Sequence, residues 1–171
     1  FVLNLLNCSS EHYQNSSLKA ECKEIELIFS EEEKVKQICS ERLWQMHRNS
    51  DSNPDVLECV LMALEKWLLE VAKRFPEELV NKFCLFLLKN SNNVAITATV
   101  LSVVEAYPEK LFGISCILIR TKEICYYDTC RGAAEIRAGL MSSFLPRDKV
   151  FEEERVTSNN FEFRKITFEQ V

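Results

Sequence analysis

The sequence predicts an all-α fold of stacked antiparallel helical hairpins, similar in architecture to HEAT and armadillo repeats. Three observations favour this class. The 171 residues are 47% hydrophobic, which is enough for a buried core. They include only 3 glycines and 4 prolines, too few for the tight turns of an all-β fold. Long segments carry apolar residues at helical spacing, and two of these segments resemble each other.

Residues 1–53 are expected to form a helical N-terminal portion that is loosely attached to the rest. Residues 1–16 are ambiguous between helix and loop. Apolar residues spaced by three and four predict a helix over 18–29. Ser30 and Glu33 match a capping box, which predicts a second helix from there to Arg48. The polar run 49–53 is the clearest loop, so we place the boundary with a helical-repeat portion, residues 54–171, at that run.

The repeat portion begins with two helices separated by a proline. Pro54 suits the first position of a helix that extends to Phe75, and Pro76 opens a second helix over 77–89. Residues 94–107 follow, with no charge before Glu105. Their β-branched side chains would also suit a strand. We predict a helix instead, buried between its neighbours, because of the repeat.

The repeat is the strongest signal in the sequence. Phe75-Pro76-Glu77 returns as Tyr107-Pro108-Glu109, and the apolar positions upstream of each block coincide under the same offset. Each unit is therefore a long apolar helix, a break at aromatic–Pro and a return helix, as in stacked α-repeats. The alternative is that two common helix junctions share these residues by chance.

The pattern weakens beyond the second proline. Residues 114–120 are apolar, a helix is expected over 122–131, and residues 148–154 could begin another helix. Residues 158–160 have the composition of a turn. Over 161–171 the spacing of apolar residues leaves helix and strand undecided.

Charge and cysteine content restrict the class of partner and the compartment. The net charge of −5 disfavours general binding to nucleic acid or to an anionic membrane. The longest apolar run, 94–104, is shorter than the ~20 residues that span a bilayer. Eight cysteines occur without any C-x-x-C pair, which predicts reduced thiols in a cytoplasmic protein rather than a zinc or disulfide framework.

No residue set in the sequence defines a reaction. Glycine-rich phosphate loops and nucleophile-elbow motifs are absent from the sequence. The two histidines lack metal-ligand spacing, and we expect His12 on the surface and His47 as a cation in the last turn of its helix. A Cys–His nucleophile pair from distant segments stays open. We therefore assign no catalytic, cofactor-binding or metal-binding residue.

Three acidic residues stand in otherwise apolar segments, namely Glu105, Asp128 and Glu135. Paired carboxylates could perform acid–base chemistry or hold Mg²⁺. The favoured interpretation is that they lie on solvated helix faces.

The candidate interface residues are Tyr126, Tyr127 and Arg131, because tyrosine and arginine often anchor protein–protein contacts. The alternative, which we prefer, places one tyrosine in the core and the other at its rim. Trp44 and Trp67 lie on apolar helical stripes and are expected in the core.

Five blocks together resemble a known family. They are Ala63-Leu64-Glu65-Lys66-Trp67-Leu68-Leu69, the segment from Asn90 to Ala98, Ala106-Tyr107-Pro108-Glu109-Lys110-Leu111, Tyr126-Tyr127-Asp128, and the segment from Glu152 to Asn160. In this order they resemble the α-helical region of large bacterial ATP-binding proteins of the STAND class, signal-transducing NTPases of which several are linked to antiphage defence. The similarity covers residues 54–171.

The resemblance implies a piece outside the ATPase core of such a parent protein, in which helical arrays recognise a target or transmit its presence. The expected function is a non-catalytic scaffold or sensor segment that needs no cofactor and binds a protein partner or other domains of a larger chain. Two alternatives remain: a small cysteine-dependent enzyme and a helical nucleic-acid-binding module.

Overall fold

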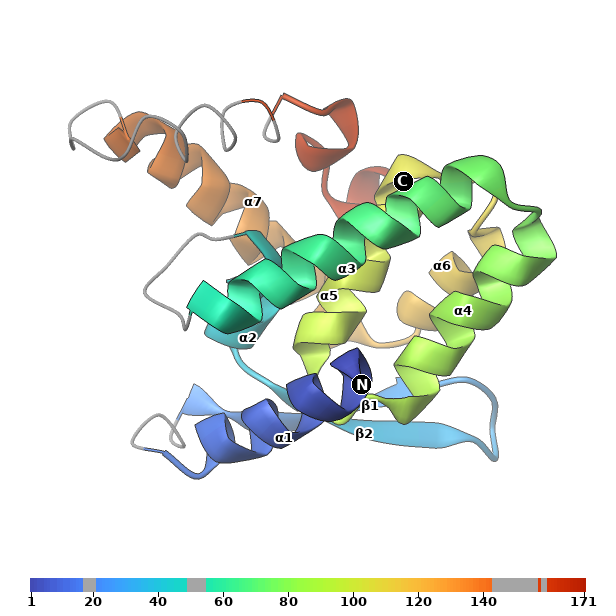
Figure 1. Cartoon of the computed structure of the whole chain (residues 1–171), viewed down its shortest axis with the longest axis horizontal. Coiled ribbons are helices and arrows are strands. Elements are labelled where there is room, and N and C mark those ends of the chain that lie inside the picture. Colours follow the sequence, from blue (N-terminus) through green and yellow to red (C-terminus); the bar gives the residue numbers. More distant parts are fainter. Residues whose placement is uncertain (17–20, 49–54, 143–156, 158–159) are drawn as a thin grey trace.

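The computed structural model describes residues 1–16, 21–48, 55–142, 157 and 160–171. These residues form seven α-helices, one two-stranded sheet and three short 3₁₀ helices (Figure 1). The predicted mostly helical fold is confirmed, with the small sheet as an addition that the sequence analysis missed. The predicted loop at 49–53, the helix at 148–154 and most of the turn at 158–160 lie outside the described residues.

The prediction of two helices over residues 18–48 is wrong for residues 21–48, and residues 18–20 lie outside the described part of the chain. The ambiguous N-terminal segment forms helix α1, Val2–Gln14. An antiparallel β-hairpin follows, made of β1, Lys23–Ile28, and β2, Lys34–Cys39. The helical elements described for this region are Glu41–Gln45 (α2) and the 3₁₀ helix Met46–Arg48 (η2).

Alternation of side chains explains why these residues pair as strands. In β1 the side chains of Ile25 and Leu27 are buried, whereas those of Glu24 and Glu26, which alternate with them, are exposed. This period of two places one face of the hairpin against the helices and the other in solvent. Ser30 does accept a hydrogen bond from the amide of Glu33 (3.0 Å), but it does so in the loop between the strands. Only this half of the predicted capping box forms, because the Glu33 carboxylate pairs with Lys89 instead of the Ser30 amide.

Helices α3, Asp55–Arg74, and α4, Glu77–Asn90, form the first predicted hairpin, and Pro76 is the N-cap of α4. Helix α5, Val94–Ala106, is the charge-poor segment, and the prediction of a buried helix there is confirmed. Asn93 caps it by accepting from the amide of Ala95 (3.1 Å). Figure 1 shows α3 in front of α5, and these two helices are in extensive contact.

Helix α6, Phe112–Leu118, follows the second proline corner and packs against α4. Lys110 of this corner donates hydrogen bonds to the carbonyls of Ala72 and Phe75 at the first corner. The two proline corners are therefore in direct contact. The return helices differ in length, because α4 has 14 residues and α6 has 7.

Helix α7, Lys122–Ser142, extends beyond the predicted end at residue 131. The C-terminal tail, residues 160–171, contains two 3₁₀ helices, Glu162–Arg164 (η3) and Phe168–Gln170 (η4), so neither a regular α-helix nor a strand forms there. Phe168 anchors the tail in the core. The amide of Phe168 donates to the Asp128 carboxylate of α7 (2.8 Å).

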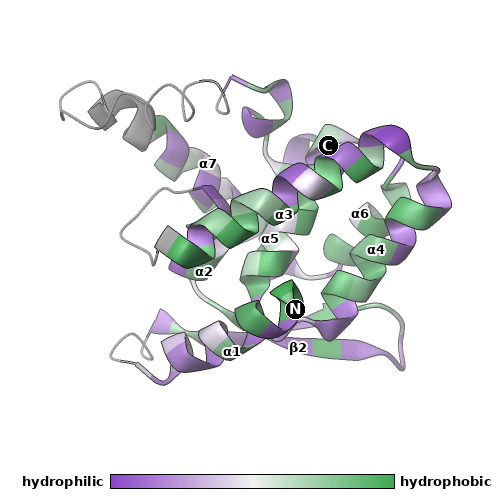
Figure 2. Cartoon of the chain, in the orientation of Figure 1, coloured by the Kyte–Doolittle hydropathy of each residue, from purple (hydrophilic) through white to green (hydrophobic). Residues whose placement is uncertain are grey.

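The core lies where α5 is surrounded by α3, α4, α6, α2 and strand β2 (Figure 2). One buried polar residue, Gln37 of β2, attaches the sheet to the helices. Its amide donates to the carbonyls of Leu88 and Ser91, and its oxygen accepts from the Thr97 hydroxyl (2.7 Å). The sheet is thus held at the α4–α5 junction by hydrogen bonds that satisfy buried groups.

Candidate functional site

A cluster of charged side chains lies inside the molecule, where α3, α5, α7, η2 and the C-terminal tail meet. We call it the ion network. Its members come from five separate elements and are mostly shielded from solvent (Arg48, Glu65, Glu105, Asp128, Arg131, Glu135 and Arg164). Buried charges are costly unless they are paired and hydrogen-bonded, so each contact in this network affects stability.

Arg131 is the hub of the ion network, and 1% of this residue is exposed. Its Nε donates to Asp128 (2.7 Å), its Nη1 to Glu135 (2.9 Å) and its Nη2 to Glu105 (3.2 Å). The same Nη2 also donates to the carbonyl of Ile166 in the tail (2.9 Å). Burial lowers the pKa of Arg131, but these carboxylates outweigh it and raise the pKa above its ordinary value.

Arg48 joins the N-terminal elements to the same cluster. Its guanidinium lies 3.7 Å from Glu65, 3.7 Å from Glu105 and 3.4 Å from Glu135. Its Nη2 donates to the Ser102 hydroxyl (3.2 Å), which in turn donates to Glu65. Burial lowers the pKa of Arg48, and the charge of Glu65 opposes that shift. An arginine remains cationic over the physiological range in either case.

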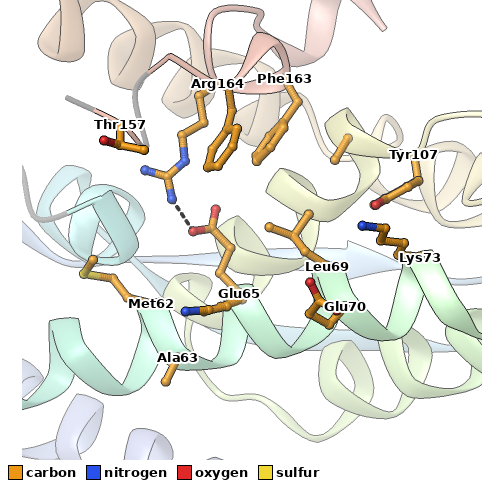
Figure 3. A pocket seen from close by; sticks show the side chains of 13 residues that line it. Met62, Ala63, Glu65, Leu69, Glu70, Lys73, Tyr107, Thr157, Phe163 and Arg164 are labelled. Carbon is orange, nitrogen blue, oxygen red and sulfur yellow. Dashed lines mark hydrogen bonds and ion pairs between the residues drawn. The ribbon is translucent and has the colours of Figure 1, made fainter. Parts of the chain in front are cut away.

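Arg164 brings the C-terminal tail into the ion network. Its Nη2 donates to Glu65 of α3, and Figure 3 shows the guanidinium pointing from the tail toward that carboxylate. Its side chain is 9% exposed. The Nε of Arg164 is buried and has no hydrogen-bond partner among the residues that the structure describes.

The ion network carries three guanidiniums against four carboxylates among its defined members. Burial raises the pKa of the Glu105 carboxyl to about 9, and the hydrogen bond to Asp128 acts in the same direction. The positive charges of Arg131 and Arg48 oppose this shift. The raised pKa favours the protonated form of Glu105, which reduces the excess of negative charge in the ion network.

His47 lies beside the ion network and is 1% exposed. Burial lowers its pKa well below 6.5, and the charges of Arg48 and Arg131 add to that shift. Nδ1 lies 3.0 Å from the Trp44 carbonyl, which can only accept, so Nδ1 carries the proton of a neutral ring. The prediction of a cationic His47 at a helix end is therefore wrong, whereas His12 is exposed as expected.

The preference for solvated Glu105, Asp128 and Glu135 is also wrong. Residues Glu105 and Asp128 are 4% and 2% exposed, and all three carboxylates bind Arg131. Asp128 and Arg131 are three residues apart on α7, and Arg131 and Glu135 are four apart. This helical spacing could have indicated that the three side chains form ion pairs. No signal in the sequence indicated Arg48, Glu65 or Arg164, because tertiary packing alone brings these distant residues together.

The structure separates the three candidate interface residues. Tyr126 is 65% exposed, whereas Tyr127 and Arg131 are buried. The Tyr127 ring stacks on Trp44 with centroids 6.2 Å apart, as expected for one tyrosine in the core and one at its rim. Only Tyr126 is available for an interface. Trp44 is buried as predicted, but Trp67 is half exposed, and the prediction that it lies in the core is wrong.

All eight cysteines are free thiols. Burial raises the pKa of Cys39 and of Cys84 to about 12, and it also raises the pKa of Cys22 and of Cys125. A nucleophilic cysteine requires the opposite shift. Among the described residues, no group of three His, Cys, Asp or Glu side chains is arranged to hold a metal ion. Within the same residues, no helix is both long and apolar enough to cross a membrane.

A pocket of about 980 Å³ lies beside the ion network. Its walls come from α3, the corner after α5 and the C-terminal tail (Figure 3). Leu69, Phe161 and Phe163 provide apolar surface, and the two phenylalanine rings stack with centroids 5.6 Å apart. Glu65 and Arg164 form the wall shared with the ion network.

Comparison with known proteins gives no relative, because no protein-family model and no curated protein matches the chain. The resemblance to the helical region of STAND-class proteins therefore stays a prediction.

Proposed function

We propose that this chain is a non-catalytic helical scaffold that binds another protein through the exposed side of the α3–α4 hairpin. We call this side the outer apolar surface. Its residues are apolar, lie on α3 and α4, and are at least partly exposed (Val56, Val60, Trp67, Leu79, Phe83 and Phe86). The exposure of these side chains on one hairpin is the observation that supports the proposal most.

The outer apolar surface is continuous across the two helices. Val56, Trp67 and Phe86 are 70%, 47% and 57% exposed. Spacings of three, four and seven residues place the members of each helix on one face. The rings of Trp67 and Phe83 meet edge to face at 5.4 Å and join the two faces. Contiguous exposed apolar surface is typical of protein interaction sites, and tryptophan is common among the residues that dominate binding.

The repeat suggests what covers this surface. The α5 and α6 helices pack against α3 and α4 on the side away from the viewer in Figure 1. In a stacked α-repeat, each hairpin contacts a neighbour on both of its sides. The proposed occupant is therefore another antiparallel pair of amphipathic helices, supplied by a partner protein or by another domain of a larger parent chain.

The proposal extends to the parent protein through the sequence resemblance alone. A STAND-class parent would be a cytoplasmic bacterial ATP-dependent signalling or antiviral defence protein, with HEAT-like stacked hairpins outside its ATPase core. This chain would then recognise a target or transmit its presence, and it would need no nucleotide of its own.

Two features of the interior support a non-catalytic role. The arginines of the ion network pair with its carboxylates, which leaves those groups little freedom for acid–base chemistry on a substrate. The pKa values of Cys22, Cys39, Cys84 and Cys125 are all raised, which disfavours nucleophilic thiols. The alternative of a cysteine-dependent enzyme therefore has no observation in its favour. The nucleic-acid alternative is weakened because Arg48, Arg131 and Arg164 are turned inward.

Site-specific photo-crosslinking tests the proposed surface. A benzoylphenylalanine residue would replace Trp67 or Phe86 in the complete protein inside its native cells. We expect each to crosslink to one defined protein, or to another domain of the parent chain. The identified partner is then purified, and Trp67→Lys should weaken its binding to the chain at least about tenfold.

The matched control places the same crosslinker at Tyr126, the exposed residue of the other candidate interface. Crosslinks from position 126 with none from positions 67 and 86 would contradict the outer apolar surface. ATP turnover by the purified chain that disappears with a single Asp or Cys substitution would contradict the non-catalytic role.

A further inference from the structure

The pocket beside the ion network has an unbalanced charge. Four of its charged residues lie on α3, namely Glu65, Lys66, Glu70 and Lys73. Glu65 is paired with Arg48 and Arg164, and Glu70 is paired with Arg74 at 2.8 Å. Neither lysine forms an ion pair with a residue that the structure describes. Both carboxylates are thus neutralised from elsewhere, while the two ammonium groups are not.

The inner wall of the pocket is formed in part by Arg164. The Arg164 side chain is nine-tenths buried and lines the pocket, and its Nε is one of the buried donors without a hydrogen-bond partner among the described residues. Because this Nε is itself buried, Arg164 forms part of the pocket wall and does not offer the Nε–H to a ligand.

The pocket also has an apolar middle and a second polar end. Figure 3 shows Lys73 and Tyr107 together at one end, with Arg164 at the other. Leu69, Phe161 and Phe163 lie among the residues that line the space. A volume of about 980 Å³ is within the range of small-molecule sites, which are mostly apolar with a few polar groups that fix orientation.

We propose that this pocket binds a small organic anion that has an apolar aromatic or acyl body. Its acidic group lies against Lys73 and the Tyr107 hydroxyl, and its body lies on Leu69 and the stacked phenylalanines. This binding is independent of the outer apolar surface, because the two involve different residues.

Two fluorescent dyes of nearly equal shape test the site. Anilinonaphthalene sulfonate has an aromatic body and one negative charge, and N-phenylnaphthylamine has the same body without the charge. We expect the sulfonate to bind the complete chain saturably at one site per molecule, and the neutral dye to bind much more weakly. Lys73→Met with Tyr107→Phe should weaken sulfonate binding roughly three- to tenfold.

The substitutions are chosen to leave the fold intact. Lys73 is exposed, and the position equivalent to Tyr107 in the first corner is Phe75, so a phenyl ring suits such a corner. Lys82→Met, an exposed lysine of α4 outside the pocket, is the charge-matched control and should leave binding unchanged. Trp67→Lys should also leave it unchanged, which separates this site from the outer apolar surface.

Three outcomes would overturn the proposal. They are the absence of saturable sulfonate binding, equal affinity for the two dyes, and equal loss of binding in the Lys73/Tyr107 and Lys82 variants. Loss of sulfonate binding in Trp67→Lys alone would assign the dye to the outer apolar surface and would likewise overturn the pocket.

Discussion

The protonation state of Glu105 affects the net charge of the buried ion network. This residue projects from α5, the most deeply buried helix, into contact with Arg131 and Arg48. Burial raises its pKa from an ordinary value of 4.5 to about 9, although both guanidiniums act against the shift. At neutral pH the folded chain therefore holds a proton on this carboxyl that the unfolded chain releases.

The pH dependence of stability follows from that proton. Between pH 4.5 and about 9 the folded state binds more protons at Glu105 than the unfolded state does, so the free energy of unfolding falls as the pH rises. One such group contributes a slope of at most about 1.4 kcal/mol per pH unit. Because glutamine cannot ionise, Glu105→Gln should remove this slope in urea unfolding measured from pH 7 to pH 8.

The control for this series is Glu109→Gln, at an exposed corner position, which should keep the wild-type slope. The upper limit of pH 8 keeps the unfolded-state thiols of Cys39 and Cys84, which ionise near pH 8.5, from dominating the slope. Equal slopes for Glu105→Gln and the wild type would show that Glu105 is ionised in the folded state.

His47 gives the opposite dependence on the acid side. Its folded-state pKa lies well below 6.5, so below that pH the unfolded chain binds a proton that the folded chain does not. The free energy of unfolding should therefore fall as the pH drops below about 6.5. In nuclear magnetic resonance spectra, the His47 ring signals should stay at their neutral-form positions from pH 7.5 to pH 5.5. A titration midpoint close to 6.5 would mean that the ring is accessible to water.

At the scale of elements, the ion network links segments that are far apart in the chain. Arg131 of α7 contacts α5 through Glu105 and the tail through Ile166, and Arg48 of η2 contacts α3 through Glu65. Removing one member of a buried network leaves its partners charged and unpaired, which costs much more than losing a pair in solvent. The orientation of α7 and the tail relative to the helical hairpins therefore depends on these contacts.

Arg131→Met tests this dependence. The substitution leaves buried carboxylates without their hub, so we expect the free energy of unfolding to fall by about 3–5 kcal/mol. Arg74→Met removes the exposed pair with Glu70 and should cost less than about 1 kcal/mol. Urea unfolding of both variants at pH 7 gives the comparison, and similar small losses for the two would mean that the ion network contributes little.

The sequence predicted secondary structure best where apolar residues followed a single helical periodicity over a long segment. Helices α3, α4 and α5 were predicted close to their observed bounds, because apolar spacing, prolines and the Asn93 cap all agreed. The prediction for residues 18–29 failed because the segment fits two patterns. Cys22, Ile25 and Phe29 have helical spacing, whereas Ile25 and Leu27 alternate as in a strand. The strand is favoured because β1 packs on α6 and β2 packs on α5, and a local sequence pattern does not contain these contacts.

The candidate site was far less predictable. The α7 residues of the ion network had visible spacing, but their burial depends on Arg48, Glu65 and Arg164, which are distant in the chain. An acidic residue in an apolar helix is usually solvated. Here α5 is covered on several sides, so Glu105 had to be neutralised inside.

At the scale of the whole molecule, the two proline corners are in contact, and α5 lies at the centre of the surrounding helices. Figure 1 shows the sheet and α1 along one edge of these helices and α7 with the tail along another. The ion network stabilises the inner side, whereas the outer apolar surface and the pocket are open to solvent. The two proposed functions therefore use different residues of the same α3 helix.

Amide hydrogen exchange of the isolated chain tests the central position of α5 most directly. If α5 is the central helix of the core, its amides from 98 to 106 should exchange only on global unfolding and be the slowest in the chain, well behind those of α1. Exchange of the α5 amides at the rate of the α1 amides would contradict the stacked arrangement and the proposals that depend on it.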